Sequence, residues 1–387
     1  MDIKQVFEGK DSCCGCSACA IACPKQCISM KADQEGFLYP EINQDLCVQC
    51  GKCRKVCPVI NQKCTDTEPD CYVAYSKDDS VRRSSSSGGI FTELALLTLQ
   101  DNGVVFGAAL DKDLKVHHQS AVSPEEIRPL RGSKYVQSDM EDTYLSVKEA
   151  LAAGKPVYFS GTPCQVAGLY TYLGFRPSNL TTQDIICHGV PSPLVWEKYV
   201  NTYQQAEAAE FRNKKYGWHY FSMHIRTPRK NYYKRLDEDF YLKLFLDNTT
   251  LRPICYDCPI KARGSQADIT LADCWSLDRV TEKVVDTDKG LSIVIANTEN
   301  GKRCIEKLEG SKKTTMIAVE SKKTLDSQSA LRQSVICNPK RSEFFSRLHQ
   351  ENFQDLMKTW YRTSFVEMLK IKYVFIKTKV RFLLKKK

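Results

Sequence analysis

The chain has 387 residues, 42% of them hydrophobic, which excludes a disordered or fibrous protein and leaves room for two or three domains. Its formal net charge is +10, but ten Lys or Arg and only one acid, Glu367, stand among residues 358–387. The rest is close to neutral, which argues against a broad nucleic-acid-binding face. No signal-peptide core and no stretch of roughly 18 apolar residues occurs, so we expect a cytoplasmic protein.

Nineteen cysteines are too many for core filling in a compartment that disfavours disulfides, so metal or cluster ligation is the leading interpretation. Ten of them lie in the first sixty residues. Two runs there repeat the spacing C-x2-C-x2-C-x3-C-P. Their members are Cys13, Cys16, Cys19 and Cys23, followed by Cys47, Cys50, Cys53 and Cys57.

This spacing is typical of bacterial ferredoxins, in which three close thiolates bind one [4Fe-4S] cluster and the fourth binds the other. One cluster is therefore assigned to a first ferredoxin site, made of Cys13, Cys16, Cys19 and Cys57. The other is assigned to a second ferredoxin site, made of Cys47, Cys50, Cys53 and Cys23. A pair of zinc sites is the alternative. Cys14 and Cys27 fall outside the pattern and are interpreted as packing thiols.

The following residues read as a polar linker (61–70) and then as alternating strands and helices. Strands are predicted at 104–110, 116–122, 156–161, 184–189, 267–273 and 291–297. Helices are predicted from Ile90 to about 101, from an N-cap at Ser123, and at 142–153, 165–173, 193–203 and about 238–247. Such alternation predicts parallel strands.

The expected fold class is therefore mixed, α+β or α/β. A small ferredoxin-like dicluster domain (1–60) is followed by the linker and by an α/β body with a partly parallel sheet. The body divides into an N-terminal part (71–155) and a C-terminal part (156–345), and a helical basic tail (346–387) ends the chain.

Two cysteines stand at the carboxyl ends of predicted parallel strands, Cys164 after 156–161 and Cys187 within 184–189. Ligands and positive helix N-termini gather at that edge of a sheet, and adjacent strands are only about 4.8 Å apart. Cys255 and Cys258 offer a C-x2-C pair to complete a site. From spacing alone, the four thiols fit a cluster, a zinc site or four ordinary buried cysteines.

Five motifs together resemble the coenzyme F420 hydrogenase/dehydrogenase beta-subunit family, which includes 7-hydroxymethyl chlorophyll a reductase. They are SSSSGGIFTELA (84–95), RGSKYVQS (131–138), SGTPCQVAGL (160–169), DIICHGVPSP (184–193) and CYDCPIKARGSQADITLADCW (255–275). The resemblance spans about residues 70–340. It implies that FAD lies against a third [4Fe-4S] cluster, held at a body site by Cys164, Cys187, Cys255 and Cys258.

The flavin needs donors for its phosphates. Ser87, Gly88 and Gly89 precede a helix and offer backbone N–H groups, with a flexible loop as the alternative. The resemblance adds two groups of flavin contacts: Arg131, Gly132, Ser133, Lys134 and Tyr135, and Gly161, Thr162 and Pro163.

His188 is the candidate proton donor, although a structural histidine fits equally well. Lys261, Arg263, Asp268 and Asp273 either line a pocket for an anionic substrate or flavin phosphate, or form surface ion pairs. The chain shows no pairing of a nucleophile with a base, which suits redox chemistry.

These features predict an iron–sulfur flavoprotein oxidoreductase. Electrons from a ferredoxin-like donor would pass through the clusters to FAD and then to a small organic substrate or a deazaflavin coenzyme. One alternative is an electron-transfer subunit of a larger hydrogenase or formate dehydrogenase complex, without its own substrate. A zinc-stabilised binding protein is the other.

The tail repeats apolar residues at helical spacing, with lysines and Arg381 among them. The apolar positions are Leu369, Tyr373, Ile376, Val380 and Leu383. This pattern predicts a basic amphipathic helix. It would lie on an anionic membrane surface, or dock on the body with a solvated charged face.

Overall fold

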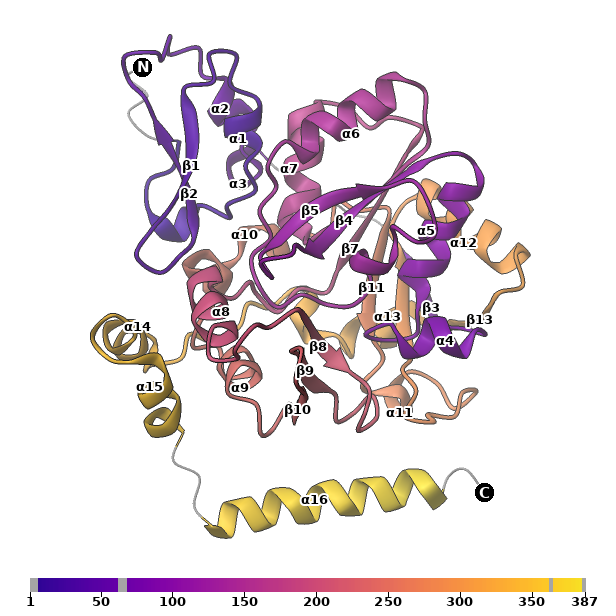
Figure 1. Cartoon of the computed structure of the whole chain (residues 1–387). Helices are drawn as coiled ribbons and strands as arrows, with labels where there is room; N and C mark the ends of the chain where they lie inside the picture. Colours follow the sequence, from indigo (N-terminus) through magenta and orange to yellow (C-terminus); the bar gives the residue numbers. More distant parts are fainter. Residues whose placement is uncertain (1–5, 62–67, 362–364, 385–387) are drawn as a thin grey trace.

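The computed structural model describes residues 6–61, 68–361 and 365–384. Figure 1 shows a small N-terminal domain beside a larger α/β body, with one long helix, α16, along the lower edge. Most of the linker expected at 61–70 lies outside the described residues. The small domain has one antiparallel hairpin and three short helices: β1 (Ile28–Ala32), β2 (Leu38–Ile42), α1 (Ala18–Ile21), α2 (Lys52–Lys55) and α3 (Pro58–Asn61).

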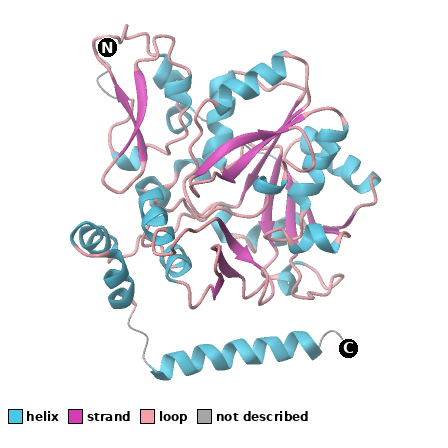
Figure 2. Ribbon diagram, viewed as in Figure 1, coloured by secondary structure: helices cyan, strands magenta, loops and turns pink. Residues whose placement is uncertain are grey.

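The body is built around an eight-stranded mixed sheet in the order β13-β3-β12-β11-β7-β6-β4-β5. Figure 2 draws the strands in magenta and the helices around them in cyan. The strands are β3 (Asp70–Ser76), β4 (Val104–Leu110), β5 (Val116–Ala121), β6 (Val157–Ser160), β7 (Leu180–Ile185), β11 (Ile269–Asp273), β12 (Ser292–Ala296) and β13 (Thr314–Val319). The neighbours β4, β6, β7 and β11 run parallel, and the other pairs are antiparallel. The expected mixed fold with a partly parallel sheet is confirmed.

A second, antiparallel sheet has the order β10-β9-β8. Its strands are β8 (Ala208–Asn213), β9 (Ser222–Arg226) and β10 (Asn231–Arg235). The body helices are α4 (Asp79–Arg83), α5 (Ile90–Gln100), α6 (Thr143–Ala152), α7 (Pro163–Leu173), α8 (Pro193–Val200), α9 (Phe240–Leu246), α10 (Pro259–Ala262), α11 (Leu277–Val280), α12 (Glu299–Gly310) and α13 (Ser321–Asp326). The C-terminal helices are α14 (Arg341–Gln350), α15 (Phe353–Trp360) and α16 (Phe365–Leu384), and the 3-10 helices are η1 (Lys10–Ser12), η2 (Arg128–Leu130), η3 (Pro253–Asp257) and η4 (Ser329–Leu331).

The two faces of the large sheet have different coverings. On β4, Val105 and Ala109 face the cluster that contains α5 and α12, whereas Val104 and Phe106 face α6 and α7. This alternation follows from the two-residue period of a strand. The cluster on the second face also includes Cys14, Cys16 and two alanines from the ferredoxin-like domain. The domain therefore packs on the face that α6 and α7 cover.

Local signals explain α7, the helix that starts beside Cys164. Thr162 and Gln165 form a capping box, Pro163 occupies the first turn, and Gly174 ends the helix with a positive φ of 80°. The helix thus begins directly after β6. Its first turn lies at the carboxyl edge of the sheet, where the sequence analysis expects it.

Two expected elements differ from the structure. The helix expected from Ser123 is a series of turns that ends in η2, because Pro129 prevents the capped turn from continuing as an α-helix. The strand expected at 184–189 ends at Ile185, where its pairing with Leu271 of β11 ends. The two expected parts of the body, 71–155 and 156–345, both contribute strands to the same sheet. The expected boundary at residue 155 therefore falls in the loop between helix α6 and strand β6, within one continuous structural unit.

Candidate functional site

The two ferredoxin loops share one backbone conformation. Gly15 and Ser17 have φ values of 68° and 64°, and Gln49 and Gly51 have values of 54° and 72°. In each loop, these left-handed residues stand on either side of the middle cysteine. Each loop is therefore tightly turned, as the binding of one cluster by closely spaced cysteines requires.

The first ferredoxin site is buried between its own domain and the body. Cys16 and Cys19 are buried. Burial raises the pKa of Cys19, and the charges of Cys13 and Cys57 raise it further. The structure thus brings Cys57, from the second run, to the three thiols of the first run. The charge of Cys53, from the second site, also raises the pKa of Cys19, so the two ferredoxin sites are neighbours.

A small hollow, partly open to solvent, marks the second ferredoxin site. Its four assigned cysteines all line the hollow: Cys23, Cys47, Cys50 and Cys53. Cys50 is exposed, whereas each cysteine of the first site is buried or partly buried. Cys27 lines the hollow as well, with its Sγ 3.3 Å from Cys23 Sγ. The second site is therefore more accessible to an external molecule than the first.

The body site gathers its cysteines at the carboxyl edge of the large sheet. Cys164 lies in the first turn of α7, and Cys187 lies two residues beyond β7. Cys255 lies in η3, and Cys258 directly precedes α10. Burial raises the pKa of Cys187, and the charges of Cys255, Cys164 and Cys258 raise it too. The four thiols predicted from distant motifs therefore lie close enough to interact.

A short backbone pairing brings the C-x2-C segment beside Cys187. Pro191 and Leu251 form an isolated antiparallel bridge, a few residues from Cys187 and Cys255. At Gly189, which has a φ of 147°, a Cβ would lie 2.8 Å from Leu251 Cδ1 and 3.3 Å from Cys255 Cβ. Only glycine permits this close approach.

The donor set at all three sites fits an iron–sulfur cluster. Each site offers four thiols, the soft ligands that such clusters use. When bound, a cluster would supply a one-electron redox centre there. Within residues 6–61, 68–361 and 365–384, no three His, Cys, Asp or Glu side chains come close enough together to hold a single metal ion.

Cys14, which the ferredoxin pattern does not use, lies between the first ferredoxin site and the body site. It is buried in the cluster that α6 and α7 form with the ferredoxin-like domain, and Cys164 packs against that cluster. A hydrogen bond with Cys16 raises the pKa of Cys14, one with Cys164 lowers it, and burial raises it further. Cys14 therefore contacts one assigned ligand of each site.

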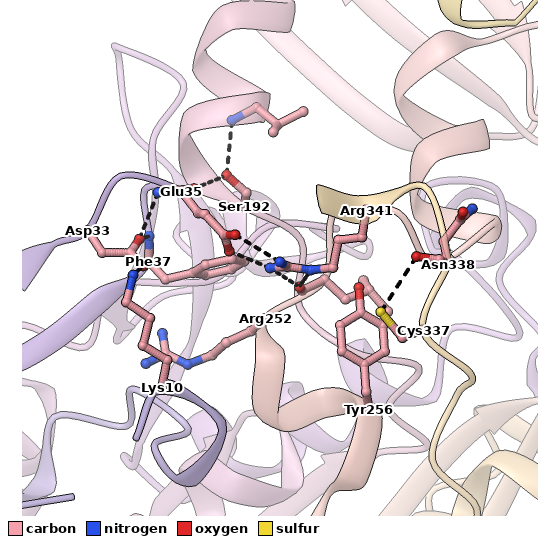
Figure 3. Close-up of polar contacts among 12 residues, drawn as sticks. Lys10, Asp33, Glu35, Phe37, Ser192, Arg252, Tyr256, Cys337, Asn338 and Arg341 are labelled. Carbon is pink, nitrogen blue, oxygen red and sulfur yellow. Dashed lines mark hydrogen bonds and ion pairs between the residues drawn. The ribbon is translucent and has the colours of Figure 1, made fainter. Parts of the chain in front are cut away.

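Arg252 joins the ferredoxin-like domain to the body next to these sites (Figure 3). It is 0% exposed. Its guanidinium donates to Cys13 O at 2.6 Å and Leu38 O at 3.0 Å in the domain, and to Gln137 Oε1 at 2.7 Å in the body. A Cβ on Gly15 would lie 2.2 Å from Gln137 Nε2, so the domain meets the body without space for a side chain there. No sequence signal pointed to Arg252, and Gln137 lies in the RGSKYVQS motif but was given no role there.

The β1–β2 turn makes a second contact with the body. Figure 3 shows Arg341 beside Glu35, with Arg341 Nη1 2.8 Å from Glu35 Oε1 and a further contact between Nη2 and Oε2. Ser192 donates its hydroxyl to Glu35 O. Asp33 shapes the turn by accepting from the N–H of Phe37 at 3.0 Å. Two arginines from separate parts of the body thus hold the ferredoxin-like domain.

Two of the segments expected at the flavin phosphates are in contact. The Ser133 N–H donates to Ser86 Oγ at 2.7 Å, and Arg131 donates to Ser84 Oγ at 3.4 Å. The Nε atom of Arg131 is buried and has no hydrogen-bond partner among the described residues. Gly132, between these donors, has a φ of 79°. The serine run and residues 131–135 therefore form one polar surface.

The glycines of the serine run are bound to the sheet. Gly88 N–H donates to Ser292 Oγ at 3.0 Å, and the Ser87 hydroxyl donates to Leu291 O at 2.6 Å. Gly89 caps α5 with a φ of 93°. The Gly88 N–H, which was expected to face a phosphate, is therefore bonded to Ser292 of β12 instead, and the Ser87 hydroxyl is bonded to the residue before that strand.

Two half-buried lysines lie beside this polar surface. Lys134 donates to Arg131 O at 2.8 Å, and Lys214 donates to Ser87 O at 2.6 Å. Burial lowers the pKa of each lysine to about 7. The unpaired Arg131 Nε fits an anionic group such as a pyrophosphate, whereas the two lysine amines already donate to backbone carbonyls and would exchange those bonds to join it.

The remaining expected flavin contacts lie beside the body site instead. Gly161, Thr162 and Pro163 form the turn from β6 into α7, and Thr162 Oγ1 is 3.1 Å from Cys164 Sγ. The charge of Lys261 lowers the pKa of Cys187, although burial of that thiol dominates. These residues therefore face the body site rather than the serine run.

Aromatic rings connect the body site with residues 131–135. His188 Nε2 lies 2.6 Å from Asn248 Oδ1, and burial lowers the pKa of His188. Its ring meets Phe245 edge-on, with centroids 4.9 Å apart. Phe245 stacks on Tyr135 at 4.2 Å. The lowered pKa favours the neutral imidazole, and the role of His188 as a proton donor stays a prediction.

Three charged residues near the C-x2-C pair make contacts within the fold. Arg263 donates to Val59 O of the ferredoxin-like domain at 2.7 Å. Asp268 accepts from the Thr182 N–H at 2.8 Å. Asp273 forms an ion pair with the buried Arg212. These contacts support the structural alternative for the three residues.

Comparisons with known families agree with this arrangement. The N-terminal part of the family described as "Coenzyme F420 hydrogenase/dehydrogenase, beta subunit" matches residues 71–143, and its C-terminal part matches residues 154–322. A "4Fe-4S dicluster domain" matches residues 12–61. The first two matches cover more than half of the chain. The chain therefore belongs to the coenzyme F420 hydrogenase/dehydrogenase beta-subunit family and carries an N-terminal 4Fe-4S dicluster domain, which confirms the resemblance in its motifs.

Individual relatives match mostly short segments. The chain is 35% identical over 66 residues to ketoisovalerate oxidoreductase subunit VorC of Methanothermobacter marburgensis, covering 15% of this chain and 84% of the relative. It is 42% identical over 60 residues to a ferredoxin of Saccharopolyspora erythraea, covering 16% of this chain and 52% of the ferredoxin. A structure of the F420-reducing [NiFe] hydrogenase complex from Methanosarcina barkeri has a TM-score of 0.46 and 16% identity, over 75% of this chain and 94% of that one.

Proposed function

We propose that the chain is an electron-transfer subunit in which three [4Fe-4S] clusters carry electrons in series. The observation that carries this proposal is the contact of Cys14 with both Cys16 and Cys164. This contact supports a short path between the first ferredoxin site and the body site through buried protein. The same path serves electrons in either direction.

The order of the sites follows from their burial. The second ferredoxin site has an exposed cysteine and an open hollow, so it would exchange electrons with a ferredoxin or another redox partner. The first ferredoxin site is its neighbour and is buried. The body site lies beyond Cys14. Membership of a beta-subunit family, and the likeness to a relative named as an oxidoreductase subunit, support the interpretation as part of a larger assembly.

We extend this proposal to FAD, bound between the serine run and the body site. FAD would convert one-electron steps into two-electron or hydride chemistry. Arg131, Lys134 and Lys214 would hold its phosphates. Tyr135, next to Lys134, stacks on Phe245, whose ring meets that of His188 beside Cys187. An organic substrate or a deazaflavin coenzyme would meet the flavin here or on the partner subunit.

An anaerobic reductive titration with dithionite tests this function. The reconstituted protein should accept about three electrons per chain without flavin, one for each [4Fe-4S] cluster, and about two more with FAD bound. Cys258→Ser should lower the uptake by about one electron per chain. Cys304→Ser should leave the uptake unchanged, because the Cys304 thiol forms a hydrogen bond with Thr181 and belongs to none of the three sites. Uptake of about two electrons by the flavin-free wild type would contradict the third cluster. The flavin part fails separately if added FAD does not increase the uptake.

A further inference from the structure

Helix α16 is docked on the body by one face. Phe375 lies edge-on to Tyr220, with ring centroids 5.0 Å apart, and the Arg235 guanidinium lies 4.3 Å from the centre of the Phe375 ring. Phe382 stacks on His219 at 4.9 Å. Phe375 and Phe382 are seven residues apart, so they share one face of the helix.

An ion pair fixes the same region of the helix. Lys379 Nζ lies 2.7 Å from Asp288 Oδ2, and the Asp288 side chain is largely buried. Ile371 and Thr378, on the face of Phe375, are also partly buried. The helix is therefore attached through a defined inner face, and its opposite face cannot also pack on the body.

The outer face of α16 is apolar. Its residues recur every three or four positions and are between 48% and 65% exposed: Val366, Leu369, Tyr373, Ile376 and Val380. At about 100° per residue, these five side chains form one continuous stripe opposite the Phe375 face. A helix that merely docks on its own protein normally has a polar outer face.

Exposed lysines border this stripe on both sides. At about 100° per residue, Lys370 and Lys377 stand on one side and Lys372 on the other. Three more lysines, 385–387, follow in the sequence. An apolar stripe between rows of cations is the pattern of a helix that lies in a membrane interface, with its apolar side chains among the acyl chains and its lysines at the phosphates.

We propose that the outer face of α16 binds the surface of an anionic phospholipid bilayer. Charge complementarity favours lipid phosphates, and the apolar stripe needs an apolar phase that a solvated acidic protein surface does not supply. No helix in the described parts of the chain is long and apolar enough to cross a membrane. The inner face would remain on the body, so the bilayer would meet the protein on the side of β8–β10 (Figure 1). This surface is independent of the proposed electron path.

Sedimentation of the full chain with lipid vesicles tests the proposal. The protein should bind vesicles of phosphatidylcholine mixed with phosphatidylglycerol, bind pure phosphatidylcholine far more weakly, and be released by salt. Lys370→Gln and Lys377→Gln should each weaken binding about fivefold, as expected for one cation near an anionic surface. Leu369→Ser combined with Ile376→Ser should weaken it at least tenfold. Val122→Ser is the matched control, because Val122 is 60% exposed but lies far from α16 in sequence, after β5.

Three results would overturn the proposal. The first is equal binding of the wild type to both kinds of vesicle, or to neither. The second is unchanged binding by the Leu369→Ser, Ile376→Ser variant, with iron content and circular dichroism confirming that each protein is folded. The third is a wild-type dimer that the same variant converts to a monomer without any vesicle binding, because a second copy of the chain would then be the occupant of the stripe.

Discussion

Arg252 is a buried charge that joins the ferredoxin-like domain to the body. It has no acidic partner in its hydrogen bonds, and its donors go to two backbone carbonyls of the ferredoxin-like domain and to an amide of the body. A charged group that is fully buried needs all of these bonds to offset the loss of water. Hydrogen bonds to the ferredoxin-like domain and to the body therefore both hold the Arg252 side chain in place.

Arg252→Met should leave Cys13 O, Leu38 O and Gln137 Oε1 without this donor. We expect the free energy of unfolding to fall by about 3 kcal/mol or more, because buried hydrogen bonds of a charged group are lost. Urea denaturation followed by circular dichroism measures the change. Arg347→Met is the control, because Arg347 pairs with Glu351 at the surface. Equal midpoints for the two variants would show that Arg252 does not hold the domain.

The low pKa values of Lys134 and Lys214 predict pH-dependent cofactor binding. Each pKa is about 7 in the ligand-free protein, and an anion favours the charged form of the lysine, so binding takes up protons. The affinity for FAD should fall as the pH rises from about 6 to about 8, by up to about tenfold for each lysine. Quenching of FAD fluorescence measures it. Lys214→Met should bind more weakly and show a smaller slope, whereas an affinity independent of pH would remove these lysines from the site.

At the scale of elements, α7 is the contact surface of the first ferredoxin site. A Cβ on Gly168 would lie 3.1 Å from Cys16 Sγ and 2.8 Å from the hydroxyl oxygen of Tyr144. Glycine within a helix otherwise costs about 1 kcal/mol relative to alanine. The absence of a side chain at Gly168 is therefore explained by the close approach of both Tyr144 of α6 and Cys16 of the ferredoxin-like domain, and not by the helix itself.

Gly168→Ala should lower both thermal stability and the iron bound at the first ferredoxin site, despite the better helix propensity of alanine. Gly310→Ala is the matched control in α12, because no atom lies within 4 Å of its added Cβ. That variant should be as stable as the wild type or slightly more stable. A stabilised Gly168→Ala protein with full iron content would refute the close packing of α7 on Cys16.

The sequence predicted most strands and helices of the body because their signals are local. The capping box at Thr162 and the buried run of β4 are examples, since each depends only on neighbouring residues. The end of β7 was misplaced because it depends on pairing with β11, which is remote in sequence. The expected helix after Ser123 is a series of turns instead. Its capping signals are present at the start of the segment, but Pro129, a few residues further on, prevents an α-helix from continuing.

At the scale of the whole molecule, the cysteine motifs indicated which thiols could act together, but not how the sites are arranged. The contact of Cys14 with Cys164 arises from packing of the ferredoxin-like domain on α6 and α7, and no spacing rule encodes such a contact. The sequence also did not predict that Arg252 joins the two domains, because its hydrogen-bond partners are remote in sequence. The amphipathic pattern of α16 was visible, whereas the choice of its docked face required the positions of His219 and Asp288.

The central claim, three clusters in one path, is tested most directly by counting iron and sulfide in protein purified without oxygen. The wild type should contain about twelve irons per chain, Cys164→Ser about eight, and Cys304→Ser about twelve. The remaining irons of Cys164→Ser should keep the spectroscopic signature of a two-cluster ferredoxin. A wild type with about eight irons, or a Cys164→Ser variant with as many irons as the wild type, would contradict the body site.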